Sequence, residues 1–423
     1  MVDSSKISKF YEKPMVERID YIVKQFNLSG KERSLLEGKI DEKLTRSLDN
    51  MIENVIGTLH LPLGIATNFI INGKERLITM AIEEPSVVAA ASNSARMTRK
   101  HGGFTCEPVR SYMIGQVQLL DIPEFKNAKR DIIGNTERIL SLANDQDPIL
   151  VNMGGGAKKI EVMEIETNLG KMMDFHLVVD CLDAMGANAV NTMVEAIAPL
   201  LEEISGGRSL LRIISNLSTH RVAKCKATFD KELLGGENVV DAILEAVEFA
   251  NNDIYRAATH NKGIMNGVSA VVLATGNDTR AIEAGAHSYA ALKESYRPLT
   301  RYSKDEEGNL TGEIEIPMAV GVIGGATKTN PVARLSLKIM EIENAETLSQ
   351  VIAAVGLAQN LAALRALVSE GIQEGHMKLH AKNVAKMAKI PEEYADTVVQ
   401  KMIEKGKVRI DIAKEIYEEV KKK

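Results

Sequence analysis

The sequence predicts an α+β protein with a large, mainly helical domain, a smaller ferredoxin-like domain inserted into it, and a helical segment at the C-terminal end. The inserted domain is indicated by the order strand, helix, strand, strand, helix, strand (βαββαβ). Helical apolar spacing on both sides of it indicates the large domain. From Gly375 onward the pattern changes to short amphipathic helices. The predicted division is 1–109 and 216–374 for the large domain, 110–215 for the small domain, and 375–423 for the C-terminal segment.

The small domain has alternating apolar strands bounded by turn residues. A helix that begins at Pro123 follows the first strand, because proline is favoured in the first turn of a helix. The sequence Asn168-Leu-Gly170 reads as the turn of the central hairpin. The predicted strands are 116–122, 160–167, 172–181 and 210–217, and the predicted helices are 123–145 and 187–204.

The large domain holds mostly helices, with short strands between them. Apolar residues at helical spacing predict a helix over 240–257. Residues 268–275 are short, apolar and rich in β-branched side chains, and glycines bound them, so a buried strand is expected there. The residues 83–86 (Glu-Glu-Pro-Ser) open a helix over 87–97, and one of the two adjacent carboxylates is expected to form its N-terminal cap.

The C-terminal segment is predicted to contain three short helices. Pro391 opens the second helix, and Gly406 separates it from the third. A module of about fifty residues buries little core by itself, so we expect it to dock on another surface as a part that can move. His376 lies at its beginning.

Composition excludes several classes of protein. With 423 residues the chain is long enough for two or three domains. Its 52 basic and 57 acidic residues give a net charge of −5, and the basic residues are spread out, so nucleic acid is not an expected partner. Its three cysteines form no CxxC pair, which favours a reducing cytoplasm over a disulfide framework.

No membrane attachment is predicted. The first ten residues are charged and lack the apolar core of a signal peptide. The most hydrophobic long stretch, 351–368, carries Gln359, Asn360 and Arg365, and it is better interpreted as a buried helix than as a membrane span. We therefore expect a soluble, cytoplasmic protein.

The common nucleotide-binding fingerprints are missing. Neither the glycine run 154–158 nor the run 321–329 has the spacing of a phosphate-binding P-loop, and no GxGxxG follows a strand. The turn 183–188 (Asp-Ala-Met-Gly-Ala-Asn) is a better candidate, because small residues let a ligand approach the backbone and the following helix offers free N–H groups to a phosphate. An ordinary strand-to-helix turn remains an alternative interpretation.

A metal site is not expected. His376 and His380 have the i, i+4 spacing of a ligand pair, but no acidic or cysteine cluster stands out as a third ligand. His376 could instead act as a proton donor on a moving segment, or it could simply be a solvated histidine at a helix start.

Lys262, Asn266 and Asp278 flank the expected strand, the first two in the turn entering it and the third in the turn leaving it. A strand of this length spans about 26 Å, so Lys262 and Asp278 would meet only if a turn folds back or a second chain intervenes. In a closed site they would shift each other's pKa values and could stabilise an oxyanion. If the second of the adjacent carboxylates Glu83 and Glu84 were buried near Asp278, its pKa would be raised and it could deliver a proton. Solvated surface residues are the other interpretation of this set.

Six short motifs in order resemble one family. They are Glu53-Asn-Val-Ile-Gly57, Glu84-Pro-Ser86, Asp183-Ala-Met-Gly-Ala-Asn188, Asn261-Lys-Gly-Ile-Met-Asn-Gly267, Gly276-Asn-Asp278 and Gly375-His-Met377. Together they resemble the signatures of 3-hydroxy-3-methylglutaryl-CoA (HMG-CoA) reductase over nearly the whole chain. The soluble class II branch fits better, because residues 215–222 lack the catalytic lysine of the membrane-anchored class, and class II uses the lysine of the NKGIMNG segment, here Lys262.

The resemblance implies an oxidoreductase that reduces HMG-CoA to mevalonate and CoA by two hydride transfers, or the reverse oxidation. The first transfer gives a hemithioacetal that collapses to an aldehyde and CoA thiolate, and the second gives the alcohol. Lys262 would hold the oxyanion and Asp278 would tune it. Glu84, chosen over Glu83 because it directly precedes Pro85-Ser86, would protonate the alcohol oxygen. His376 would protonate the thiolate.

The resemblance also implies binding residues. Ser86, Arg256 and Asn266 would contact the HMG portion, and Asp183, Met185, Gly186 and Asn188 would lie against the dinucleotide. Asp147 matches an acidic position associated with the adenine ribose, where a carboxylate accepts a 2′-hydroxyl and repels a 2′-phosphate. We therefore expect NADH to be preferred, with NADPH possible and no metal. Asp145 lies close enough to be the alternative acidic residue.

Finally, the resemblance implies a homodimer or a larger dimer-based assembly, with the site between subunits and residues 375–423 as a flap that closes over it. This arrangement would remove the spacing problem between Lys262 and Asp278. A non-redox CoA-thioester enzyme and a non-catalytic CoA- or nucleotide-binding scaffold remain alternatives. Turnover of a nicotinamide cofactor separates both from a reductase.

Overall fold

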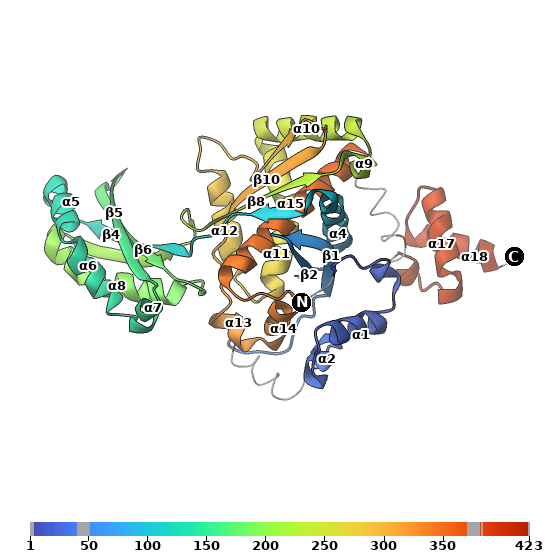
Figure 1. Cartoon of the computed structure of the whole chain (residues 1–423), viewed down its shortest axis with the longest axis horizontal. Coiled ribbons are helices and arrows are strands. Elements are labelled where there is room, and N and C mark those ends of the chain that lie inside the picture. The colour runs from blue at the N-terminus through green and yellow to red at the C-terminus, as the bar shows by residue number, and fades with distance from the viewer. Residues whose placement is uncertain (1–3, 40–50, 370–380, 382–383, 422–423) are drawn as a thin grey trace.

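The computed structural model describes residues 4–39, 51–369, 381, 384–421. Figure 1 shows a central body, a smaller α/β unit on one side and a pair of helices on the other. The α+β prediction with an inserted ferredoxin-like domain is confirmed.

The small unit is a four-stranded antiparallel sheet with helices on one face. Its strands lie in the order β5-β6-β4-β7. With two βα units and a central hairpin, this order is that of a ferredoxin-like sheet. The predicted helix 123–145 is in fact two helices, because the chain breaks at Asn135. The strands are β4 (Tyr112–Leu120), β5 (Gly156–Thr167), β6 (Gly170–Asp180) and β7 (Arg208–Ser215), and the helices are α5 (Phe125–Gly134), α6 (Thr136–Asn144), α7 (Pro148–Asn152) and α8 (Ala187–Ser205).

The central body is built on a six-stranded sheet in the order β2-β1-β3-β8-β10-β9. The helix α15 (Ala345–Val368) packs on strands β8 and β10 and on the helices α4 (Val87–Thr98) and α11 (Ile254–Ala274). The remaining elements are β1 (Leu63–Ile71), β2 (Lys74–Ala81), β3 (Phe104–Cys106), β8 (Val222–Phe229), β9 (Thr300–Lys304), β10 (Leu310–Pro317), α9 (Lys231–Leu234), α10 (Glu237–Asn252), α12 (Thr279–Ala290), α13 (Gly325–Thr329) and α14 (Pro331–Ile339), with the short 3-10 helix η2 (Arg99–His101).

Helix α15 is the centre of the core. It is apolar around its whole circumference, and nearly all of its residues from Leu348 to Leu361 are buried. Within the described residues it is long and apolar enough to span a membrane by length and composition, but 67% of its most apolar window is buried inside the protein. The prediction of a buried helix at 351–368 is therefore confirmed.

The predicted strand 268–275 is wrong. These residues form the second half of α11, which begins after its N-cap Asp253 and continues to Ala274. Buried Ile264, Val268 and Val271 recur at helical spacing and face α15 and the sheet, so tertiary packing outweighs the β-branched composition. The predicted helix 240–257 is likewise divided at Asp253, between α10 and α11.

Both ends of the chain add small helices to this body. Near the N-terminus, η1 (Phe10–Glu12), α1 (Met15–Gln25) and α2 (Gly30–Leu36) pack through a small apolar cluster onto β2 and α14. At the other end, α17 (Glu392–Glu404) and α18 (Ile410–Lys421) share a separate cluster with the helical residues 384–387. Pro391 and Gly406 border α17, as the sequence predicts.

Candidate active site

Lys262, Asn266 and Glu84 lie together. Lys262 and Asn266 are four residues apart on α11 and so share a face of the helix, not a turn as the sequence suggested. The Nζ atom of Lys262 lies 3.0 Å from Oε2 of Glu84. The amide Nδ2 of Asn266 donates to the same oxygen at 3.4 Å. A cation, an amide and a carboxylate therefore meet at one partly exposed point.

A strained turn at Ser86 places Glu84 beside α11. Ser86 has φ 73° and ψ −16°, the left-handed conformation that non-glycine residues rarely adopt. The chain reverses there into α4, and Ser86 occupies the N-cap position without making a side-chain cap. The expected cap by the adjacent glutamates is therefore wrong, because the carboxylate of Glu84 turns to Lys262 instead.

Arg256 lies in the first turn of α11, where it is available to an anion. Its side chain is half-buried, and that burial lowers the pKa of its guanidinium. Among the described residues no carboxylate lies within ion-pair distance of it. A half-buried guanidinium without a carboxylate partner suits a carboxylate ligand, because the fork of N–H groups matches two oxygens.

Within one chain, Asp278 does not lie beside Lys262 and Glu84. It is the N-cap of α12, where its carboxylate accepts from the backbone N–H groups of Arg280 and Ala281. The Arg280 side chain pairs with it at 3.1 Å, and this bond lowers the pKa of Asp278. From Lys262 to the end of α11 the helix rises about 18 Å, so one chain alone does not unite Lys262 with Asp278.

Buried polar residues that the sequence did not single out hold α11 in place. The amide of Asn360 donates to the carbonyl of His260 at 3.3 Å, and its Oδ1 accepts from Thr300 Oγ1 at 2.9 Å. Because Thr300 donates there, its oxygen accepts from His260 Nε2 at 2.6 Å, which requires the neutral Nε2–H tautomer. Burial, with a further contribution from Arg256, lowers the pKa of His260 to about 3. No local signal predicted this set, because its members come from three elements.

The turn between β6 and α8 has the geometry of a phosphate cradle. Gly186 has φ 106° at the N-cap of α8, and a Cβ there would lie 2.3 Å from Cys181 Sγ, so the position requires glycine. No side chain caps α8, and Asn188 is exposed in its first turn. This start of a 19-residue helix suits a dinucleotide pyrophosphate.

Two predicted cofactor residues have structural bonds. Asp183 Oδ1 accepts from the backbone N–H of Ala345 at 2.8 Å, so its carboxylate faces the start of α15. Asp147 is the N-cap of α7 and accepts from the N–H of Leu150 at 3.0 Å. Its other carboxylate oxygen accepts no hydrogen bond within the described part of the chain. His376 and His380 lie outside the described residues. In the described part of the chain no cluster of three or more His, Cys, Asp or Glu is placed to hold a metal, and the sequence prediction on this point stays a prediction.

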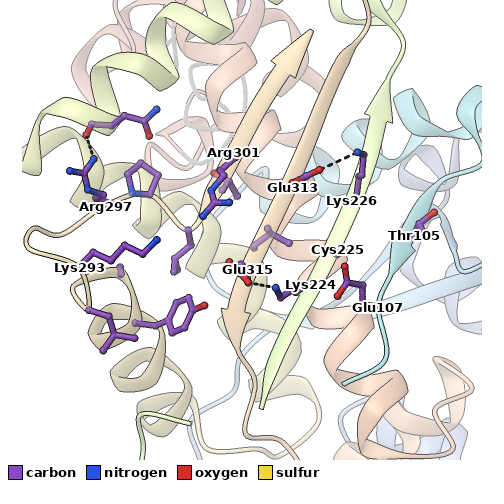
Figure 2. A pocket seen from close by; sticks show the side chains of 18 residues that line it. Thr105, Glu107, Lys224, Cys225, Lys226, Lys293, Arg297, Arg301, Glu313 and Glu315 are labelled. Carbon is purple, nitrogen blue, oxygen red and sulfur yellow. Dashed lines mark hydrogen bonds and ion pairs between the residues drawn. The ribbon is translucent and has the colours of Figure 1, made fainter. Parts of the chain in front are cut away.

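A groove of about 540 Å³ lies elsewhere, on the face of the six-stranded sheet opposite α15. Figure 2 shows its floor, where Lys224 pairs with Glu315 at 2.5 Å and Lys226 pairs with Glu313 at 3.1 Å. None of the predicted site residues lines it. Because its floor consists of two exposed ion pairs, we interpret it as a solvated polar surface.

Comparison with known proteins decides the family. The sequence model described as hydroxymethylglutaryl-coenzyme A reductase matches residues 14–381. The 3-hydroxy-3-methylglutaryl-coenzyme A reductase of Archaeoglobus fulgidus is 56% identical over 419 residues, which is 99% of this chain and 95% of that protein. The chain belongs to the HMG-CoA reductase family.

Solved structures identify the branch. The chain matches an HMG-CoA reductase of Streptococcus pneumoniae with a TM-score of 0.83 and 39% identity, covering 98% of this chain and 99% of that one. It also matches the class II HMG-CoA reductase of that organism bound to NADPH in open conformations, with a TM-score of 0.82 and 40% identity over 86% of this chain and 99% of that one. The predicted class II resemblance is confirmed.

Family membership fixes the reaction and the kind of cofactor. The chain is an oxidoreductase that converts between HMG-CoA and mevalonate plus CoA with a nicotinamide dinucleotide as the hydride carrier. The start of α8 and the glycine at its N-cap fit such a cofactor.

Proposed function

We propose that this reductase acts at a site where Lys262 and Glu84 of one subunit meet Asp278 of a second subunit. The observation that carries this proposal is the 3.0 Å contact between Lys262 and Glu84, with Asp278 separated from it by the length of a helix. A two-fold axis that brings the Asp278 end of one α11 to the Lys262 region of the other would complete the set twice per dimer.

Each side chain has a role that its chemistry suits. The ammonium of Lys262 stabilises the negative charge that develops on the substrate carbonyl oxygen at each reduction. Asp278 of the second subunit fixes that ammonium. Glu84 delivers the proton to the alcohol oxygen, and Asn266 orients Glu84 through its 3.4 Å hydrogen bond. His376, outside the described residues, protonates the CoA thiolate.

Arg256 and Ser86 hold the HMG portion. The guanidinium of Arg256, which pairs with no carboxylate among the described residues, receives the substrate carboxylate. The hydroxyl of Ser86 is held by a left-handed backbone and makes no cap, so it is available to the substrate. Asn266 contributes its amide from the same side.

The turn 183–188 receives the dinucleotide that supplies hydride. Met185, Gly186 and Asn188 present backbone to the pyrophosphate at the start of α8, while Asp183 anchors the turn to α15. This assignment divides the chain as the sequence does, with 110–215 as the cofactor domain, since all four strands of the second sheet fall in that range.

The cofactor preference is proposed to be NADH over NADPH, carried by Asp147. Asp147→Asn tests it cleanly, because asparagine keeps the helix cap of α7 but removes the negative charge. We expect the ratio of kcat/KM for NADPH to that for NADH to rise on the order of tenfold or more, since a like-charge repulsion disappears. Asp145→Asn tests the alternative acidic residue, and it should leave this ratio unchanged. Equal catalytic efficiency of the unaltered enzyme with both cofactors would contradict the assignment.

Assembly as a homodimer, a flap at 375–423 and a cytoplasmic location belong to the same proposal. Large apolar side chains are exposed around the ends of α11, among them Phe249, Ile254, Tyr255 and Leu273. Exposed apolar residues of this size around a proposed shared site support contact with a second copy. A gel-filtration mass of one chain, with full activity, would contradict it.

The assay that tests the reaction measures NADH oxidation with HMG-CoA, run in parallel with NADPH. Oxidation of two NADH per CoA released is the expected result. Activity with NADPH alone would keep the reaction and reject the role of Asp147. Binding without oxidation of either cofactor, by protein that is folded and dimeric, would favour a scaffold.

A further inference from the structure

Arg221 is a buried cation outside the residues assigned so far. It follows β7 in the segment that returns from the small domain to β8, and its side chain is 1% exposed. Burial lowers the pKa of its guanidinium, which nevertheless stays charged because arginine titrates far above neutral pH. Its partners are backbone carbonyls: Ala184 at 3.0 Å, Met185 at 3.4 Å and Val320 at 2.5 Å.

These carbonyls come from two parts of the fold. Ala184 and Met185 belong to the turn that enters α8, and Val320 belongs to the segment that follows β10 in the large domain. The backbone of Arg221 joins the same place, since its carbonyl accepts from the N–H of Met318 at 2.8 Å. Arg221 therefore connects three segments. They are the turn that enters α8, the segment that returns from the small domain to β8, and the segment that follows β10 in the large domain.

Neighbouring bonds extend this joint. The N–H of Val322 donates to the carbonyl of Asp183 at 2.9 Å, and Ala184 forms a parallel bridge with Ile323. A Cβ on Gly321 would lie 2.5 Å from the nitrogen of Met185, so the two segments are in backbone contact. The distance between the turn at 183–185 and the segment at 320–323 is therefore set by direct main-chain contact, and Arg221 donates to carbonyls of both segments.

The same joint reaches the catalytic part of the large domain. The N–H of Gly321 donates to Asn277 Oδ1 at 2.8 Å, and Asn277 directly precedes Asp278. One short path of contacts therefore runs from the proposed cofactor turn, through Arg221 and Gly321, to the proposed catalytic aspartate.

We propose that Arg221 is a positioning residue that fixes the cofactor turn 183–186 relative to the Asn277–Asp278 turn. The inference rests on the proposed function for the two turns it joins. Without the guanidinium, the buried carbonyl of Val320 and the partly buried carbonyls of Ala184 and Met185 lose their donor, and a buried acceptor without a partner is costly. The turn 183–186 is then no longer fixed, so the affinity for the dinucleotide falls more than the affinity for the HMG portion.

Arg221→Met and Arg221→Lys test this role. Arg76→Met is the matched control, because Arg76 is 6% exposed and also donates to two backbone carbonyls, those of Met340 and Glu341, but within the large domain alone. The measurements are the Kd for NADH by direct titration, the KM for NADH and for HMG-CoA, and the melting temperature of each variant.

For Arg221→Met we expect the Kd and KM for NADH to rise about tenfold while the KM for HMG-CoA changes less than about twofold. Arg221→Lys, which keeps the charge and a donor, should recover part of that loss. Arg76→Met should lower the melting temperature comparably without changing the Kd for NADH. If Arg221→Met does not fold, the comparison rests on Arg221→Lys against the unaltered enzyme, and its Kd for NADH should rise, by less than about tenfold.

An unchanged Kd for NADH in the Arg221 variants would overturn the proposal, as would an equal rise in Arg76→Met or an equal rise in both KM values. The failure of the proposed function looks different. In that case Gly186→Ala, which disturbs the proposed cofactor turn directly because a Cβ there would lie 2.3 Å from Cys181 Sγ, also leaves the Kd for NADH unchanged.

Discussion

The contact between Lys262 and Glu84 contributes little to folding. The Lys262 side chain is 61% exposed and that of Glu84 is 35% exposed, so water and salt screen their attraction. A strained Ser86 turn is nevertheless maintained to bring them together. A costly local geometry that yields little stability is typical of a residue kept for its chemistry.

Lys262→Ala should therefore separate activity from stability. We expect kcat to fall by about 10²- to 10³-fold, since the oxyanion loses its cation, while the melting temperature barely changes. The matched control is Lys226→Ala on β8, which breaks a similarly exposed pair with Glu313 on β10. Its turnover should equal that of the unaltered enzyme. If both variants lose turnover equally, Lys262 has no special role.

His260 predicts how acid affects stability. The pKa of His260 is about 3 in the folded protein and about 6.5 in the unfolded chain. Between these values His260 is protonated in the unfolded chain but neutral in the folded protein, which favours unfolding. Stability is full above pH 6.5 and is lost as the pH falls toward 3. Lowering the pH from 8 to 5 should therefore reduce the free energy of unfolding by about 2 kcal/mol through His260.

Urea unfolding of the unaltered protein and of His260→Gln at those two pH values measures this effect. Glutamine can still donate to Thr300 but takes up no proton, so the variant should be less stable at pH 8 and lose about 2 kcal/mol less on acidification. The same loss in both proteins would mean that His260 is not the acid-sensitive group.

At the scale of elements, α11 shows where sequence patterns fail. The run 268–275 is short, apolar and bounded by glycines, which fits a buried strand as well as a helix segment. The residues 268–275 are helical because α11 packs against α15, a helix far along the chain. The βαββαβ order of the small domain was predictable, because its strands alternate, its turns are marked and its central pair, β5 with β6, is a hairpin local in sequence.

Two glycines on α11 test this packing. A Cβ on Gly267 would meet Gln359 Cβ at 2.9 Å and the Val355 carbonyl at 3.0 Å, whereas a Cβ on Gly263 meets only Ala363 Cβ at 3.7 Å. Gly267→Ala should destabilise the protein by about 1–3 kcal/mol, because α15 must shift. Gly263→Ala should stabilise it by up to about 1 kcal/mol, because alanine favours a helix. Denaturant unfolding of the two variants measures both effects, and equal free energies of unfolding would contradict the close packing.

At the scale of the whole molecule, the sequence identified the site residues only through motifs shared with a family. Spacing alone left Lys262 and Asp278 as two distant polar residues, and in one chain they remain apart. The structure adds the contact of Lys262 with Glu84 and the buried joint around Arg221. The resemblance placed Lys262 and Glu84 in one site, but neither their direct contact nor the joint around Arg221 has a local pattern, because each joins residues from elements far apart along the chain.

The most direct test of the shared site mixes two inactive variants, Lys262→Ala and Asp278→Ala, under conditions where subunits exchange. A mixed dimer then has one site with both residues altered and one site with both intact, if each site takes Lys262 from one subunit and Asp278 from the other. Random mixing makes half of the dimers mixed, so HMG-CoA-dependent NADH oxidation should return to about a quarter of the unaltered rate. No recovery, although mass measurement shows that mixed dimers form, would contradict a site divided between subunits.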